Sequence, residues 1–89
     1  MSAVHLRWAK GGEAELLALG ADAITLRSTI PSPPGSRIEG ALASPPPATV
    51  KVKIHASKRQ DDGSYVLEGR PLDLTRELRD RLAALVAAR

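Results

Sequence analysis

With 89 residues the chain is long enough for one small domain, and its net charge of +3 permits a nucleic-acid partner without requiring one. It contains no cysteine, which excludes disulfides, thiolate metal sites and cysteine nucleophiles, and its single tryptophan and tyrosine predict an aliphatic core. No apolar run reaches the roughly 18 residues of a membrane span, and residues 1–9 lack the apolar segment of a signal peptide, so we expect a cytoplasmic protein without a membrane partner.

The first half of the chain predicts short strands separated by turns. Val4, Leu6 and Trp8 alternate with polar residues, as in a strand with one buried face, so Trp8 is expected to fill the core. The second segment is rich in alanine and leucine, and a short helix is an alternative there. The proline-rich segments 30–35 and 44–47 predict loops, because proline has no amide to donate to a sheet. The strands are expected at about 4–9, 13–19, 23–28 and 36–43.

A long hairpin is predicted in the second half of the chain. Its first strand spans about 49–59, where Val50, Val52, Ile54 and Ala56 alternate with a polar set that is expected to face solvent. The following turn contains an Asp-Gly step, which supplies the positive φ that tight turns need. The returning strand is expected over about 64–70, with Pro71 as its end. The outward set of the first strand is Lys51, Lys53, His55 and Ser57.

The last segment, about 74–87, predicts an amphipathic helix. Leu74, Leu78 and Leu82 recur at helical spacing, and this stripe is expected to pack on the strands. Either Asp73 or Thr75 can cap the free amides of the first turn. Six strands followed by one helix predict a mainly β single domain over 1–89, in which a small six-stranded antiparallel barrel removes exposed sheet edges.

This order of elements resembles the PilZ domain, a six-stranded barrel followed by a helix. The resemblance lies in residues 23–28 followed by the Pro-Gly step within 33–38, in the hairpin 49–70, and in the helical segment 72–82. It implies a PilZ-like fold for the whole chain.

The chain departs from PilZ domains at the segments with which they bind cyclic-di-GMP. Those domains carry an Arg-x-x-x-Arg segment before the barrel, whereas Arg7 has no arginine four residues away. They also carry an Asp/Asn-x-Ser-x-x-Gly segment on the second strand, where residues 16–22 are mostly aliphatic. A diphosphate ligand needs fixed guanidinium groups. The resemblance therefore implies a degenerate PilZ-like domain that does not bind cyclic-di-GMP, and no cofactor is expected.

Neither catalytic chemistry nor a metal site is indicated by the residues. His5 and His55 are isolated on predicted solvent faces, and no nucleophile lies beside a base. We therefore expect no enzyme activity. Basic side chains on the hairpin and the helix are candidates for partner binding, although a solvated outer face would also explain them. These candidates are Lys51, Lys53, His55, Arg76 and Arg79.

Degenerate PilZ domains typically act through protein contacts. The resemblance therefore implies a non-enzymatic adaptor or regulator in bacterial polarity or motility signalling, with a response regulator or a small Ras-like GTPase as the expected partner. A small basic barrel that binds nucleic acid is the second hypothesis, because few aromatic side chains are present to stack on bases. A nucleotide second-messenger sensor with a modified PilZ site is the third.

Overall fold

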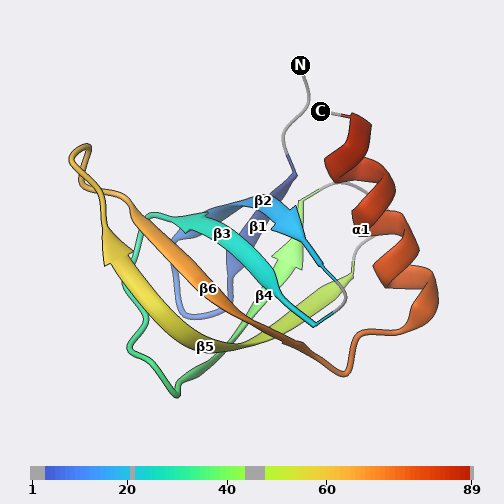
Figure 1. The fold of residues 1–89 in the computed structure, drawn as a ribbon, viewed down its shortest axis with the longest axis horizontal. Coiled ribbons are helices and arrows are strands. Elements are labelled where there is room, and N and C mark those ends of the chain that lie inside the picture. Colours follow the sequence, from blue (N-terminus) through green and yellow to red (C-terminus); the bar gives the residue numbers. More distant parts are fainter. Residues whose placement is uncertain (1–3, 21, 44–47, 89) are drawn as a thin grey trace.

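The computed structural model describes residues 4–20, 22–43 and 48–88, and within these ranges it has six strands followed by one helix (Figure 1). Two strands, β2 and β5, have the predicted bounds, and the other elements differ from the prediction by one or two residues at one or both ends. The predicted loop at 44–47 lies outside the described residues. The elements are β1 His5–Trp8, β2 Glu13–Leu19, β3 Ile24–Ser28, β4 Arg37–Leu42, β5 Thr49–Arg59, β6 Tyr65–Leu72 and α1 Arg76–Ala88.

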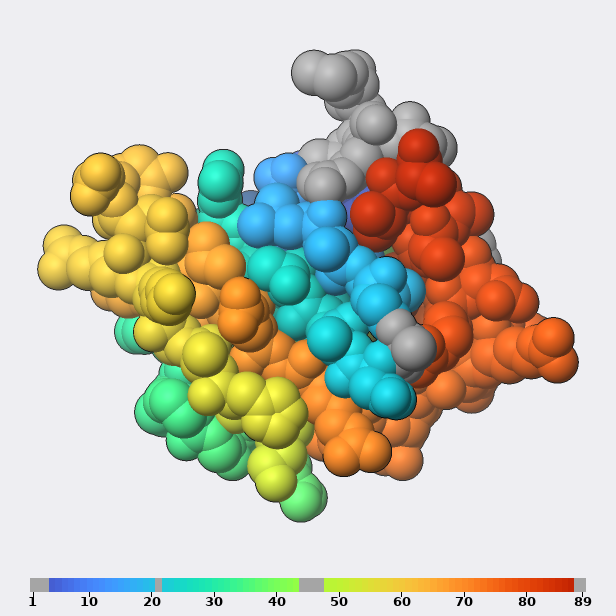
Figure 2. Space-filling view, viewed as in Figure 1, coloured from blue at the N-terminus to red at the C-terminus, as the bar shows by residue number. Residues whose placement is uncertain are grey.

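The strands form a closed antiparallel barrel in the order β1-β2-β3-β6-β5-β4, and β4 pairs with β1 to complete the ring. This arrangement confirms the predicted fold class, and it shows that 13–19 is a strand and not a helix. In the ring, β5 lies three strands away from β2 in either direction. Helix α1 packs against β2, and Figure 2 shows the tip of the β5–β6 hairpin projecting on the side away from α1.

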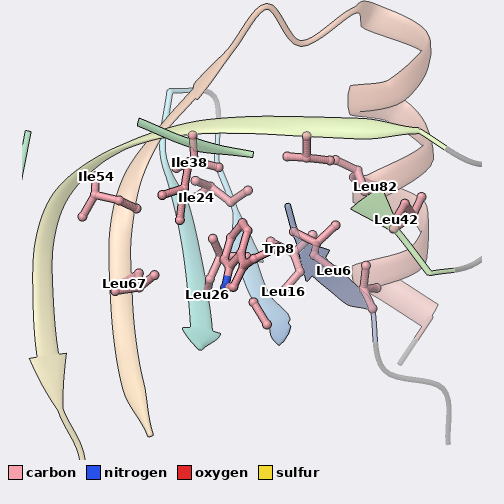
Figure 3. Packing of buried hydrophobic residues seen from close by; sticks show 14 residues of the cluster. Leu6, Trp8, Leu16, Ile24, Leu26, Ile38, Leu42, Ile54, Leu67 and Leu82 are labelled. Atoms are coloured by element: carbon pink, nitrogen blue, oxygen red, sulfur yellow. The ribbon is translucent and has the colours of Figure 1, made fainter. Parts of the chain in front are cut away.

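The barrel interior is filled by aliphatic side chains around a single tryptophan (Figure 3). Trp8 is buried, which confirms the predicted role, and its indole N–H donates a hydrogen bond to Ser28 Oγ at 2.9 Å. The helix contributes the fully buried Leu82, and the rest of its apolar stripe packs against the same core, as predicted. The buried apolar residues are Val4, Leu6, Trp8, Ala14, Leu16, Ile24, Leu26, Ile38, Leu42, Val50, Val52, Ile54, Leu67 and Leu82.

Strand β5 departs from the predicted alternation after Ile54. Its pairing with β6 moves from Ile54 opposite Gly69 to Ala56 opposite Glu68, so His55 is an additional residue in a β-bulge. Beyond the bulge Ser57 lies opposite the buried Leu67. The expectation that Ala56 faces the core and Ser57 faces solvent is therefore wrong, because one extra residue reverses the alternation.

Strand β6 was predicted to end before Pro71, but it continues to Leu72. Its pairing with β3 stops where Ile24 lies opposite Gly69, whereas its pairing with β5 continues to Leu72. Pro71 therefore lies where β6 has a neighbour on one side only. Proline is tolerated at such an edge because the amide that it lacks would point to the side without a neighbouring strand.

Thr75, and not Asp73, caps helix α1. The Leu78 amide donates to Thr75 Oγ1 at 3.2 Å, and the Arg79 amide donates to the Thr75 carbonyl at 2.9 Å. Replacing Thr75 with alanine is expected to lower the free energy of unfolding by about 1 kcal/mol, because one amide loses its acceptor. Denaturant unfolding followed by Trp8 fluorescence measures this loss. The Thr75→Ser variant should keep most of the stability, and an equal loss in both variants would contradict the cap.

Candidate functional site

The basic residues of β5 lie in register with basic residues on both neighbouring strands. Lys53 is opposite Arg37 of β4 and also opposite Arg70 of β6. Directly opposed residues on adjacent strands have Cβ atoms about 5 Å apart, and like charges at that spacing destabilise a sheet. These three residues, called the basic row below, therefore place repelling cations across three strands of the outer surface.

The side chains of the basic row are accessible to a partner. Arg37 and Arg70 are exposed, and Lys53 between them is half-buried, as expected for a long side chain whose stem lies between neighbours. Among the described residues, no hydrogen bond or ion pair holds any of these three side chains. Their charges are therefore available to an external anion.

Carboxylates lie beside the basic row but not opposite it. Glu39 is directly opposite Lys51, and this opposite-charge pair lies two register positions from the pair of Arg37 and Lys53. Glu68 lies opposite Ala56 beyond the bulge. The exposed His55 occupies the bulge itself. On the outer surface of β4, β5 and β6 the cations outnumber the carboxylates; the cations are Arg37, Lys51, Lys53, Lys58 and Arg70.

An open groove borders the basic row on the side of Lys51. Its lining combines two apolar residues, Ile38 and Leu72, with charged residues. Asp73 at its edge has a φ of 50°, which is uncommon for a residue other than glycine. The groove is open to solvent and does not form an enclosed cavity, so it suits a protein segment better than a buried small molecule.

The five predicted site residues fall into two groups. Lys51, Lys53 and His55 lie on β5 as predicted. Arg76 is exposed in the first turn of α1, whereas Arg79 is half-buried and its Nη1 donates to the Gly20 carbonyl at 3.3 Å, which connects the helix to the end of β2. Because α1 packs on β2, three strands from β5, the helix arginines are not part of the basic row.

The described carboxylates and histidines outside the basic row do not form a second site. In the described part of the chain, no three His, Cys, Asp or Glu side chains gather where they could hold a metal ion. Asp62 belongs to the hairpin turn, where its Oδ1 accepts hydrogen bonds from the Ser64 amide at 2.9 Å and hydroxyl at 2.6 Å, and these bonds lower the pKa of its carboxyl. Within the same described ranges, no helix has the length and apolar character needed to cross a membrane.

Comparison with known proteins gives no relative. No protein-family model, curated protein or solved structure matches the chain. The barrel and the terminal helix agree with the fold that the PilZ resemblance implies, while membership of that family stays a prediction.

Proposed function

We propose that the protein is a non-enzymatic binding module that attaches to an acidic surface of a partner protein through the outer face of β4, β5 and β6. The basic row carries this proposal. Arg37, Lys53 and Arg70 repel one another across adjacent strands, and a carboxylate-rich partner would replace that repulsion with attraction. The cations would also accelerate encounter with an acidic surface.

An acidic protein explains this surface better than a nucleic acid does. Binding of single strands relies on aromatic side chains that stack on bases, but Trp8 is inside the barrel and Tyr65 packs against the core. Glu39 and Glu68 flank the basic row and would repel a phosphate backbone that runs past it. Protein binding is therefore the favoured function.

The resemblance to degenerate PilZ domains supports a specific class of partner. It makes a response regulator or a small Ras-like GTPase in bacterial polarity or motility signalling the first partner to test, in the cytoplasm and without a cofactor. Cyclic-di-GMP is not the proposed ligand, because Arg7 lacks a second arginine at the family's spacing.

Reversing the outer charges of the basic row is expected to weaken partner binding. The variant with both Arg37→Glu and Arg70→Glu should bind about tenfold or more weakly, since each substitution exchanges attraction for repulsion. Arg76→Glu makes the same charge change on α1, which packs against β2, two strands from β4 and from β6, and should bind normally. The measurement is affinity capture from host lysate with mass spectrometry, followed by calorimetry with the purified partner.

Two outcomes of this experiment would contradict the proposal. Unchanged affinity in the double variant would show that the partner binds elsewhere. Recovery of nucleic acid and ribosomal proteins, lost as salt is raised, would favour the nucleic-acid function instead.

A further inference from the structure

Strand β5 has an open edge beyond its bulge. It pairs with β4 only from Thr49 to Lys53. Ile54 is then bonded to the loop between β3 and β4: its carbonyl accepts from the Gly35 amide at 2.7 Å, and its amide donates to the Ser36 carbonyl at 2.8 Å. Past Ile54, β5 continues to Arg59 with β6 as its neighbour. Among the described residues, no backbone hydrogen bond is made from the other edge of this stretch.

The hydrogen-bond alternation identifies which backbone groups face the open edge. In an antiparallel pair, successive residues direct both their N–H and C=O groups alternately toward and away from the partner strand. The Gln60 amide donates to the Ser64 carbonyl at 2.8 Å, so Gln60 faces the partner strand. Because the alternation repeats every two residues, the backbone groups of Lys58 and Ala56 also face β6. The backbone N–H and C=O groups of Ser57 and Arg59 therefore point to the open edge.

The charges along this edge select its occupant. Lys58 and Arg59 are exposed at the edge, and the exposed His55 lies at the bulge between them and the basic row. Lysine on an edge strand is a common protection against pairing with a second copy, because two identical basic edges repel each other. The same cations attract a strand that carries carboxylates.

We propose that an extended acidic segment of the partner pairs with β5 at Ser57 and Arg59 and adds a strand to the sheet. This mode of recognition combines backbone hydrogen bonds, which supply affinity, with alternate side chains, which supply specificity. It rests on the proposed function and specifies how the acidic partner is held. The bound segment lies beside the bulge, with Lys58 and the basic row available to its carboxylates.

The amides of Ser57 and Arg59 provide a direct test. The probe is a short, soluble peptide of alternating valine and glutamate, added to the full chain, with hydrogen exchange followed by NMR. Exchange at Ser57 and Arg59 is expected to slow about tenfold or more, because both amides gain an acceptor. Ala56 and Lys58, which already face β6, should change little. Absence of binding, or protection confined to other residues, would overturn the proposal.

A proline at Ser57 separates strand addition from charge attraction. Ser57→Pro removes the outward amide without changing the charge or a hydrogen bond to β6, so it should reduce peptide affinity about tenfold at an unchanged melting temperature. Ser57→Thr is the matched control and should bind normally. If the proline variant does not fold, the unaltered protein is tested with a peptide N-methylated at alternate amides on either edge, and normal binding of both forms would overturn the proposal.

The acidic docking surface and the strand addition predict different binding results for the two variants. If Ser57→Pro binds normally while the double variant of Arg37 and Arg70 binds weakly, strand addition is overturned and the acidic docking surface stands. If the double variant binds normally while Ser57→Pro binds weakly, the basic row is not the docking surface.

Discussion

Replacing Gly69 with alanine is expected to lower the free energy of unfolding by about 3 kcal/mol, because a single added methyl group would overlap backbone atoms. A Cβ at this position would meet the Lys53 carbonyl oxygen, and it would lie 2.8 Å from Val52 Cγ1. Lys53 cannot simply move away, since its other side pairs with Arg37 of β4. The barrel must therefore distort at the junction of three strands.

Gly20→Ala is the matched control for Gly69→Ala. The nearest atoms to a Cβ at Gly20 belong to Ala23, at 3.8 and 4.0 Å, which are ordinary contact distances. Urea unfolding followed by Trp8 fluorescence should show a large loss for Gly69→Ala and little change for Gly20→Ala. Equal stability of the two variants would mean that β5 and β6 are farther apart than the structure places them.

Replacing Trp8 with alanine is expected to lower the free energy of unfolding by about 4 kcal/mol, the typical loss when a large buried aromatic side chain is removed. Only 2% of Trp8 is exposed, and its ring lies over Gly40, where a Cβ would come within 2.9 Å of Trp8 Cε3. The ring therefore occupies space that β4 leaves open, and its removal creates a cavity in the centre of the barrel.

Variants that remove part or all of the Trp8 ring give a graded test of this expectation. Ser28 Oγ accepts from the Trp8 indole at 2.9 Å and from the Ile30 amide at 3.1 Å, and it donates to the Ile30 carbonyl at 2.7 Å. Trp8→Phe keeps most of the ring and should be less destabilising than Trp8→Ala. Thermal unfolding by circular dichroism measures both variants, and a melting temperature unchanged in Trp8→Ala would contradict a central role for this ring.

The strands could be predicted because their alternation depends on burial, which the residue types report directly. The pairs Val50 and Val52, or Leu6 and Trp8, indicate a buried face without any knowledge of the neighbouring strands. The bulge could not be predicted in this way. Nothing in the residue types around His55 indicates an extra residue, because a bulge is a property of the pairing between two strands.

The same bulge explains why the basic row was not predicted as a unit. Counting back from the turn, where Gln60 pairs with Ser64, would place Lys53 opposite Pro71. The extra residue shifts the register by one, and Lys53 instead lies opposite Arg70. Arg37 and Arg70 are outward positions on strands predicted from the sequence, but their alignment with Lys53 requires the three-dimensional pairing.

The closed order of the strands also has a consequence for how the chain folds. β6 pairs with β5 across the short turn that Gln60 and Ser64 close, and it pairs with β3, which lies far from it in the sequence. Before the pairing with β3 forms, the strands can join in the order β3-β2-β1-β4-β5-β6 as one open sheet. We therefore expect the pairing of β6 with β3 to close the ring last. Pairings between segments distant in sequence form slowly. The open sheet, with the facing edges of β3 and β6 unpaired, is thus the species in which newly made chains are most prone to aggregate.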